Sequence, residues 1–191
     1  SQSLKNSALR LAAPFAHTPR RRPHNRIAIG YLSHDFRDHP VAHQLYPLFR
    51  LHDRKRFKVI AFSTGPDDGS AYRKAIRDHC EKFIDISTCG MVEAAQTIYH
   101  QKVHILIDLM GHSLHNRMGI LALRPAPLQV GYLGFLSTTG TDFIDYIVAD
   151  DVVVPPDHRD YYSEQLMRMP GCYQINHRRW NDSLSGSRRK D

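Results

Sequence analysis

The chain has 191 residues, of which 41 % are hydrophobic and 24 % are charged. These proportions allow a buried core and exclude global disorder, and the length suits one domain with tails. No apolar run approaches the roughly 20 residues of a membrane-spanning helix, and no secretion signal is visible. The three cysteines are spaced too widely for a disulfide framework or a zinc motif, which fits a reducing, cytoplasmic setting.

Much of the net charge of +7 lies near the two ends of the chain. Arg20–Arg22 form one basic run, and Arg178, Arg179 and 188–190 supply the other. Terminal basic runs are usually solvated linkers. Nucleic-acid binding is the alternative, but no aromatic residues are interleaved with the charges and no reader motif is present. The sequence therefore does not favour a nucleic-acid partner.

Apolar runs and helical patterns alternate along the middle of the chain. After a short helical piece over 4–11, the predicted order is strand 26–32, helix 43–51, strand 57–62, helix 72–80 capped by Ser70, strand 82–86, helix 92–99, strand 104–109, helix 118–123, and strands 128–132 and 145–149. Short continuous apolar runs are typical of parallel strands covered on both faces. The pattern predicts an α/β fold with a Rossmann-like parallel sheet and right-handed crossovers.

Composition divides the chain into three parts. Residues 1–24 are predicted to be a linker from upstream structure, on which the short helical piece would pack. Residues 25–175 form the Rossmann-like domain, and 176–191 form a basic linker toward a further domain.

Polar residues follow several of the predicted strands. In open α/β sheets, ligands gather beyond the carboxyl ends of the strands. The loops that follow four of them are 33–43, 63–69, 108–117 and 131–140, and three of these are dense in His, Ser, Thr, Asp and Gly. The sequence therefore predicts a site at this edge of the sheet.

The first loop contains His39 and His43, whose i, i+4 spacing is open to a metal-site interpretation. Pro40 argues against that interpretation, because proline favours the first helical turn and leaves His39 outside the helix. The glutamate of the zinc-protease motif is also absent. We expect His39 at a helix N-terminus with a ring nitrogen in a cleft, and His43 on the first turn as a hydrogen-bonded residue.

The later loops leave more alternatives open. Asp108 ends a buried strand, where it either binds a ligand or caps the next loop. Gly111 permits an unusual backbone angle or a close approach. Arg117 either reaches a phosphate or carboxylate or lies on the surface.

Glycines and hydroxyls frame the last loop. Gly134 and Gly140 flank Ser137–Thr139, which suits sugar or phosphate oxygens as well as a plain turn. No GxGxxG motif follows the first strand and no P-loop is present, so neither a dinucleotide nor a triphosphate site is indicated.

These loops together resemble a known family. The run 26–43, with Tyr31-Leu-Ser-His-Asp-Phe36 and His39-Pro-Val-Ala-His43, resembles the start of the catalytic region of protein O-GlcNAc transferases, glycosyltransferase family 41. The stretch from Tyr162 to Tyr173 resembles the bacterial, tetratricopeptide-linked members especially well. Further stretches fit in the same order: 63–69, 108–117, 123–129 and 134–140.

The resemblance implies a GT-B architecture, with two Rossmann-like domains and a cleft between them. This chain resembles the N-terminal domain, which tetratricopeptide repeats precede and a UDP-binding domain follows. Members of the family transfer N-acetylglucosamine from UDP-GlcNAc to Ser or Thr of a protein or peptide acceptor, with inversion and without a metal or cofactor. The isolated chain would then be inactive.

The resemblance also assigns roles to residues. His39 matches the active-site histidine, as a base or as a positioning group, and Pro40 and His43 belong to the same motif. Stretches at Gly111-His112 and Leu133-Gly134 match those that contact the donor sugar or line the acceptor cleft. The substrate-binding set that we expect is completed by Asp108, Arg117, Thr138 and Thr139.

Departures from the family pattern keep other readings open. Gln96 and Tyr99 stand where animal members have acidic and histidine residues, and Leu136 replaces a common Gly or Pro. The alternatives are an O-fucosyl- or N-glucosyltransferase of the same family, and a non-catalytic binding module that keeps the fold.

Overall fold

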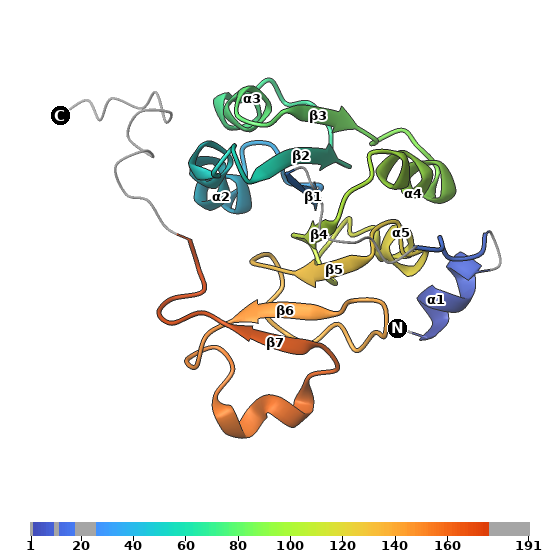
Figure 1. Ribbon diagram of the computed structural model, residues 1–191, viewed down its shortest axis with the longest axis vertical. Helices are drawn as coiled ribbons and strands as arrows, with labels where there is room; N and C mark the ends of the chain where they lie inside the picture. The colour runs from blue at the N-terminus through green and yellow to red at the C-terminus, as the bar shows by residue number, and fades with distance from the viewer. Residues whose placement is uncertain (1, 10–11, 18–25, 176–191) are drawn as a thin grey trace.

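The computed structural model describes residues 2–9, 12–17 and 26–175 (Figure 1). The basic runs at Arg20–Arg22 and in 176–191 lie outside the described residues. The elements are α1 (Gln2–Leu9), β1 (Ile27–Ser33), α2 (Pro40–Leu51), β2 (Phe57–Ser63), α3 (Ala71–Asp78), β3 (Lys82–Asp85), α4 (Met91–His100), β4 (Ile105–Asp108), α5 (Met118–Ala122), β5 (Leu128–Gly131), β6 (Tyr146–Ala149), a 3₁₀ helix (Pro156–Tyr161) and β7 (Gln165–Arg168).

The seven strands form one parallel sheet in the order β3-β2-β1-β4-β5-β6-β7. The chain winds outward from β1 to β3 and then crosses back to β4, so the order reverses between β1 and β4. This is the doubly wound arrangement, whose switch point opens a crevice at the carboxyl ends of the two central strands. The predicted Rossmann-like α/β class is confirmed.

Two apolar layers cover the two faces of the sheet. In Figure 1, α2 and α3 lie on one face and α4 and α5 on the other. Alternate residues of β2 divide accordingly: Ala61 packs toward α2 and α3, and Phe62 toward α4 and α5. The central strands are buried on both faces because the crossovers between β1 and β5 place helices α2 to α5 over the sheet, and this is why these strands have continuous apolar sequences.

The predicted strands are confirmed to within one or two residues at either end. One helix boundary is wrong, because α2 begins at Pro40 rather than at residue 43. The fixed φ of proline suits the first position of a helix, and His39 caps it. The strand β7 and the 3₁₀ helix were not predicted. Three of the four β7 residues are exposed, so this edge strand carries no apolar run.

The short N-terminal helix predicted over 4–11 is present as α1. It lies against α5 (Figure 1), and Ala8 is fully buried in the core on that face. Part of the segment expected to be a linker therefore contributes to the packing of this domain. No helix among the described residues is long and apolar enough to cross a membrane.

Candidate functional site at the carboxyl edge of the sheet

The switch point lies between two adjacent loops at the carboxyl edge. In the sheet register, Leu32 of β1 pairs with Asp108 of β4, so the loops that follow these strands start side by side. The loop after β5 starts at the same level, since Gly131 pairs with Asp108. His39 and Gly111 therefore belong to neighbouring loops at one edge of the sheet. Thr138 lies farther along the connection from β5 to β6, where it bonds to Glu164 at the amino end of β7.

His39 is the N-cap of α2, in an extended conformation with φ −154°. Its Nδ1 lies 3.3 Å from the Val41 amide, which donates to it, and 3.5 Å from Asp35 Oδ2. About a third of the side chain is exposed (33 %). The ring is thus held by the helix start on one side and faced by a carboxylate, while part of it stays accessible.

Asp35 is buried and tied to the end of β1. Its backbone amide donates to Ser33 Oγ at 2.9 Å, and Arg37 Nη2 lies 3.3 Å from its Oδ1. The side chain is 10 % exposed. Asp35 carries no local signal in the sequence, because its role depends on the turn that brings it back to His39.

Pro40 and His43 support the start of α2. Pro40 occupies the first helical position. His43 Nε2 lies 2.6 Å from Asp38 Oδ1, and its ring packs on Tyr72 with centroids 4.1 Å apart. His43 is therefore the hydrogen-bonded residue that the sequence predicts. Within the described residues, no group of three or more His, Cys, Asp or Glu side chains could hold a metal ion.

A buried arginine fixes the loop that carries His39. Arg73 of α3 donates to the Phe36 carbonyl at 3.1 Å and to Ser63 Oγ at 2.8 Å. It also donates to Asp85 Oδ2 at 2.8 Å, and its side chain is 3 % exposed. Arg73 joins the ends of β2 and β3 to the loop after β1. The signal in the sequence is a charged residue among the buried positions of α3, and it was not used to predict the site.

Asp108 at the end of β4 caps the loop that follows. Its Oδ2 accepts from the Gly111 amide at 2.8 Å and its Oδ1 from the Met110 amide at 3.3 Å. Burial raises the pKa of this carboxyl from 3.8 to about 6, against the opposing effect of the two amides. Of the two alternatives left open, the geometry favours the cap.

Two glycines allow the loops after β4 and β5 to approach closely. Gly111 has φ +50°, and a Cβ there would lie 2.5 Å from Cβ of Phe135. A Cβ at Gly134 would lie 1.9 Å from the Leu109 carbonyl oxygen. Leu133 adopts φ +70° and buries its side chain. Gly111 and Gly134 are therefore required by contact, whereas Leu133 carries a left-handed backbone despite its side chain.

His112 and Thr139 join the same two loops. His112 Nε2 lies 2.8 Å from the Thr139 carbonyl oxygen, and the ring meets Phe135 edge-on with centroids 5.5 Å apart. The predicted residues of the β4 and β5 loops are thus in direct contact with one another.

Thr138 and Thr139 are anchored by Glu164, which was not among the predicted site residues. Glu164, which directly precedes β7, accepts from the Thr138 hydroxyl at 2.7 Å and from the Thr139 amide at 2.7 Å. Burial would raise the pKa of Glu164, but the hydrogen bonds from Thr139 and Thr138 hold it below its ordinary value. Glu164 is 25 residues from Thr139 in the chain, so no local sequence pattern predicts the contact.

The guanidinium of Arg117 donates hydrogen bonds to backbone carbonyl oxygens. It donates to the carbonyl oxygens of Ile86 at 2.9 Å and Cys89 at 2.6 Å. These bonds tie the loop between β3 and α4 to the start of α5. The guanidinium lies at the predicted edge, but the structure gives it a third role beside the two expected from the sequence.

A pair of histidines bridges the switch point. The rings of His34, after β1, and His115, after β4, stack with centroids 4.6 Å apart and planes 22° apart. Burial lowers the pKa of His34, Asp35 opposes this, and His115 lowers it further. Neither residue was singled out in the sequence, because the contact depends on β1 and β4 being neighbours.

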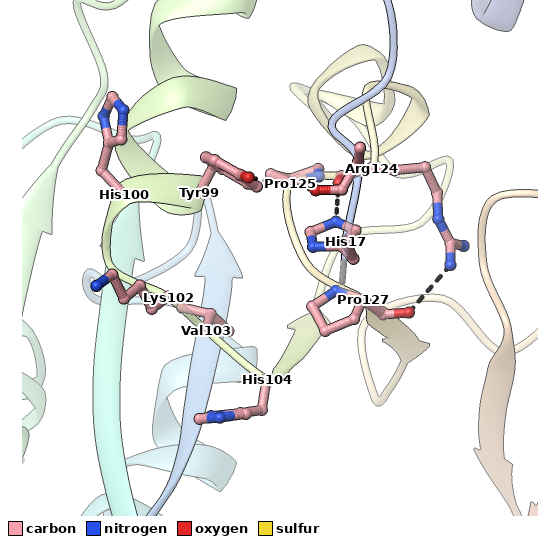
Figure 2. A pocket seen from close by; sticks show the side chains of 10 residues that line it. His17, Tyr99, His100, Lys102, Val103, His104, Arg124, Pro125 and Pro127 are labelled. Atoms are coloured by element: carbon pink, nitrogen blue, oxygen red, sulfur yellow. Dashed lines mark hydrogen bonds between the residues drawn. The ribbon is translucent and has the colours of Figure 1, made fainter. Parts of the chain in front are cut away.

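A cavity of about 930 Å³ lies at the opposite, amino edge of the sheet (Figure 2). Lys102–His104 precede β4 and Arg124–Pro127 precede β5, which places the cavity there. Its lining consists of Ala16, His17, Tyr99, His100, Lys102, Val103, His104, Arg124, Pro125 and Pro127. None of the predicted site residues lines it, so the cavity and the predicted site are separate features.

The strand order and the polar loops at the switch point define a Rossmann-like domain with a candidate ligand site at its carboxyl edge. The chain belongs to glycosyl transferase family 41, whose sequence model matches residues 4–185.

Two curated relatives and one solved structure illustrate the similarity. The chain is 38 % identical over 151 residues to the probable UDP-N-acetylglucosamine–peptide N-acetylglucosaminyltransferase SEC of Arabidopsis thaliana, covering 79 % of this chain and 16 % of that protein. It is 37 % identical over 166 residues to the UDP-N-acetylglucosamine–peptide N-acetylglucosaminyltransferase of Caenorhabditis elegans, covering 85 % and 14 %. A mutant of Thermobaculum terrenum O-GlcNAc transferase superposes with a TM-score of 0.80 at 32 % identity, over 90 % of this chain and 34 % of that one. The chain thus spans less than a fifth of either curated relative.

Proposed function

We propose that this chain supplies the acceptor-side half of the catalytic centre of an inverting protein O-glycosyltransferase. The reaction moves N-acetylglucosamine from UDP-GlcNAc to Ser or Thr hydroxyls of a protein or peptide acceptor. Family membership and the printed activities of the relatives support this assignment. The observation that carries it is the placement of His39 at the start of α2, beside the switch point, with Asp35 facing its ring.

An inverting transfer needs an acceptor hydroxyl held in line with the anomeric carbon while the diphosphate departs on the other side. His39 can meet this need in two ways. With the proton on Nε2, the ring accepts from the Val41 amide and donates outward to a substrate oxygen. With the proton on Nδ1, directed at Asp35 Oδ2, the lone pair of Nε2 is available for the hydroxyl proton.

The remaining predicted residues shape the substrate side. Pro40 and His43 fix the start of α2 that presents His39. The β4 and β5 loops, with Gly111, His112 and Leu133–Gly134, place backbone and imidazole groups at the same edge. Thr138 and Thr139 complete this set, while Asp108 and Arg117 hold the loops in shape.

The proposal includes parts beyond this domain. Domain 25–175 works with a second Rossmann-like domain that clamps the UDP diphosphate, reached through 176–191, and with tetratricopeptide repeats reached through 1–24. The protein acts in the cytoplasm and requires no metal or cofactor. Under this division the 191-residue chain alone transfers no sugar.

The test measures sugar transfer by the full-length protein that carries this chain, by intact-mass analysis of a Ser-containing peptide. UDP-GlcNAc, UDP-glucose and GDP-fucose are compared as donors. We expect a mass increase of one N-acetylhexosamine with UDP-GlcNAc alone, and none with the isolated chain. A preference for GDP-fucose or UDP-glucose would show that N-acetylglucosamine is the wrong donor sugar. Transfer by the isolated chain would show that a second domain is not required. No transfer with any donor would favour a non-catalytic binding module.

A further inference from the structure

We propose that Glu164 is a positioning residue for sugar transfer. It acts through Thr139, whose carbonyl oxygen holds His112 with the proton on Nε2. The lone pair of His112 Nδ1 is then the acceptor for a substrate hydroxyl. This inference rests on the proposed function, and it adds a residue that directly precedes β7, the strand farthest from β1 in the sheet. It depends on three linked contacts.

The first contact consists of the hydrogen bonds that the buried carboxylate of Glu164 accepts. Glu164 is completely buried (0 % exposed). Its Oε1 accepts from the amide and the hydroxyl of Thr139, and its Oε2 accepts from the hydroxyls of Thr138 at 2.7 Å and Ser163 at 3.1 Å. All four donors are neutral, so the carboxylate is stabilised by fixed dipoles rather than by a cation. Such charge-assisted bonds are stronger than neutral ones, and they fix the loop residues that donate them.

The second contact sets the direction of the hydroxyl bonds. Thr139 has one hydroxyl proton, and a carboxylate oxygen can only accept it. The 2.9 Å contact between the hydroxyls of Thr139 and Thr141 therefore runs from Thr141 to Thr139. The Thr141 hydroxyl thus donates to the Thr139 hydroxyl, which donates to Glu164 Oε1, and the Thr139 amide donates to the same carboxylate oxygen. The orientation of Thr139 is thus fixed from both its backbone and its side chain.

The third contact sets the state of His112. Its Nε2 lies 2.8 Å from the Thr139 carbonyl oxygen, which is an acceptor only, so Nε2 must carry the proton. The neutral ring then has its lone pair on Nδ1. Phe135 lies edge-on to the ring and packs against Gly111, which limits rotation of the imidazole. An imidazole with a fixed Nδ1 lone pair can accept from a sugar or acceptor hydroxyl.

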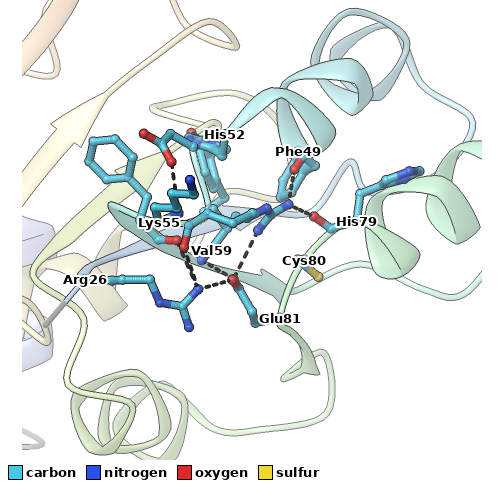
Figure 3. Close-up of polar contacts among 12 residues, drawn as sticks. Arg26, Phe49, His52, Lys55, Val59, His79, Cys80 and Glu81 are labelled. Atoms are coloured by element: carbon cyan, nitrogen blue, oxygen red, sulfur yellow. Dashed lines mark hydrogen bonds and ion pairs between the residues drawn. The ribbon is translucent and has the colours of Figure 1, made fainter.

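Glu81, which directly precedes the other outermost strand, β3, provides a comparison carboxylate (Figure 3). It accepts from a backbone amide, that of Val59 at 2.5 Å, as Glu164 accepts from Thr139. Its other donors are the guanidinium groups of Arg26 at 2.8 Å and Arg54 at 3.1 Å. Glu81 joins β2 and β3 to the segments before β1 and after α2, and it touches none of the predicted site residues. It therefore controls for the loss of a hydrogen-bonded carboxylate as such.

The experiment compares Glu164→Met, Glu164→Gln and Glu81→Met. Gln keeps an oxygen for the Thr139 amide, and the hydroxyls of Thr138 and Ser163 can turn to accept from its amide group. Met keeps the volume and loses every acceptor. Imidazole nitrogen shifts of the histidines, read by NMR on the chain, report the tautomer of His112, and kinetics of the full-length protein report transfer.

We expect a single Nε2–H tautomer of His112 in the wild type, in Glu164→Gln and in Glu81→Met, and a mixture of tautomers in Glu164→Met. In the full-length protein, Glu164→Met should lower kcat by about 10- to 100-fold with a small change in KM, as misplacement of a positioned group does. The Gln and Glu81 variants should stay within about threefold of the wild-type kcat, since neither removes the Thr139 anchor.

Three results would overturn the inference: an Nδ1–H tautomer in the wild type, a folded Glu164→Met variant with an unchanged His112, or a changed His112 with unchanged kcat. The last result would leave the proposed function standing, because transfer itself would be intact. Where Glu164→Met does not fold, Thr139→Val removes the hydroxyl and keeps the amide, and we expect a smaller shift toward mixed tautomers.

Discussion

The two edges of the sheet are built differently. At the carboxyl edge, residues of one loop contact residues of the next, as the ring of His34 does that of His115. At the amino edge lies a sizeable cavity, but its arginine, Arg124, donates to the Pro127 carbonyl and to Asp145. The comparison shows that the volume of a cavity and the convergence of chemically useful groups are separate properties. In this domain none of the predicted site residues lines the cavity, and the site that we propose lies at the edge that the rule for parallel sheets favours.

Backbone conformation separates the same two regions. At the amino edge, Lys102 and Arg124 have positive φ just after α4 and α5, where a left-handed residue commonly ends a helix. At the carboxyl edge, Gly111 and Leu133 have positive φ within loops that pack on one another. The first set ends helices, and the second shapes a surface. The following changes test this contrast, from the largest expected effect to the smallest.

Substitution of the N-cap histidine should have the largest effect. In the full-length protein, His39→Ala should lower kcat for transfer about 1000-fold, or about 4 kcal/mol, because the group that handles the acceptor proton is lost. His100→Ala, at an exposed residue of the amino-edge cavity, should change kcat less than twofold. Steady-state transfer assays and circular dichroism of both variants make the comparison. If the His39→Ala and His100→Ala proteins had equal kcat values, the proposed site at the carboxyl edge would be wrong.

A methyl group at Gly134 should be the next most damaging change. Its Cβ would meet the Leu109 carbonyl oxygen at 1.9 Å, so the loops after β4 and β5 must separate. We expect Gly134→Ala to lower the free energy of unfolding by about 3 kcal/mol in urea titration. Gly171→Ala, where a Cβ has nothing within 4 Å, is the control and should change it by about 0.5 kcal/mol at most. A tolerated Gly134→Ala would mean that the loops are not tightly packed.

The buried carboxyl of Asp108 should make stability depend on pH. Its pKa is raised from 3.8 to about 6, so the folded chain binds this proton more tightly than the unfolded chain. The resulting stabilisation is complete below pH 3.8 and is lost as pH rises through about 6. Relative to Asp108→Asn, the wild type should lose about 2 kcal/mol between pH 4 and pH 7, measured by urea unfolding at each pH. A constant difference between the two proteins would show that the carboxyl has an ordinary pKa.

The smallest effect is expected at the amino edge. Lys102 follows the end of α4 with φ 55°, a conformation that costs an ordinary L-residue about 1 kcal/mol and glycine almost nothing. Lys102→Gly should therefore raise the free energy of unfolding by about 1 kcal/mol, and transfer should be unchanged. Thermal and urea unfolding measure the gain. A loss of stability or of transfer would show that Lys102 has a role in the cavity that it lines.

Much of the carboxyl edge could be predicted because its signals are local. His39 beside Pro40, and glycine before a hydroxyl-rich run, are visible within a few residues. Arg73, His34 and Glu164 could not be identified this way, since each gains its role from partners that are distant in the sequence. Arg117 illustrates the difference: the sequence indicated a ligand contact or the surface, and the fold brought two backbone carbonyls within its reach.

The sequence by itself determined the class of fold, because parallel strands buried on both faces require consecutive apolar residues, and helical segments separate them in the chain. It also determined which loops carry imidazoles, hydroxyls and glycines. Only the tertiary structure decided how these groups are paired. The order of the strands sets which loops become neighbours, and that order follows from the packing of the whole sheet rather than from any one segment. Glu164 meets Thr139 and His34 meets His115 for this reason.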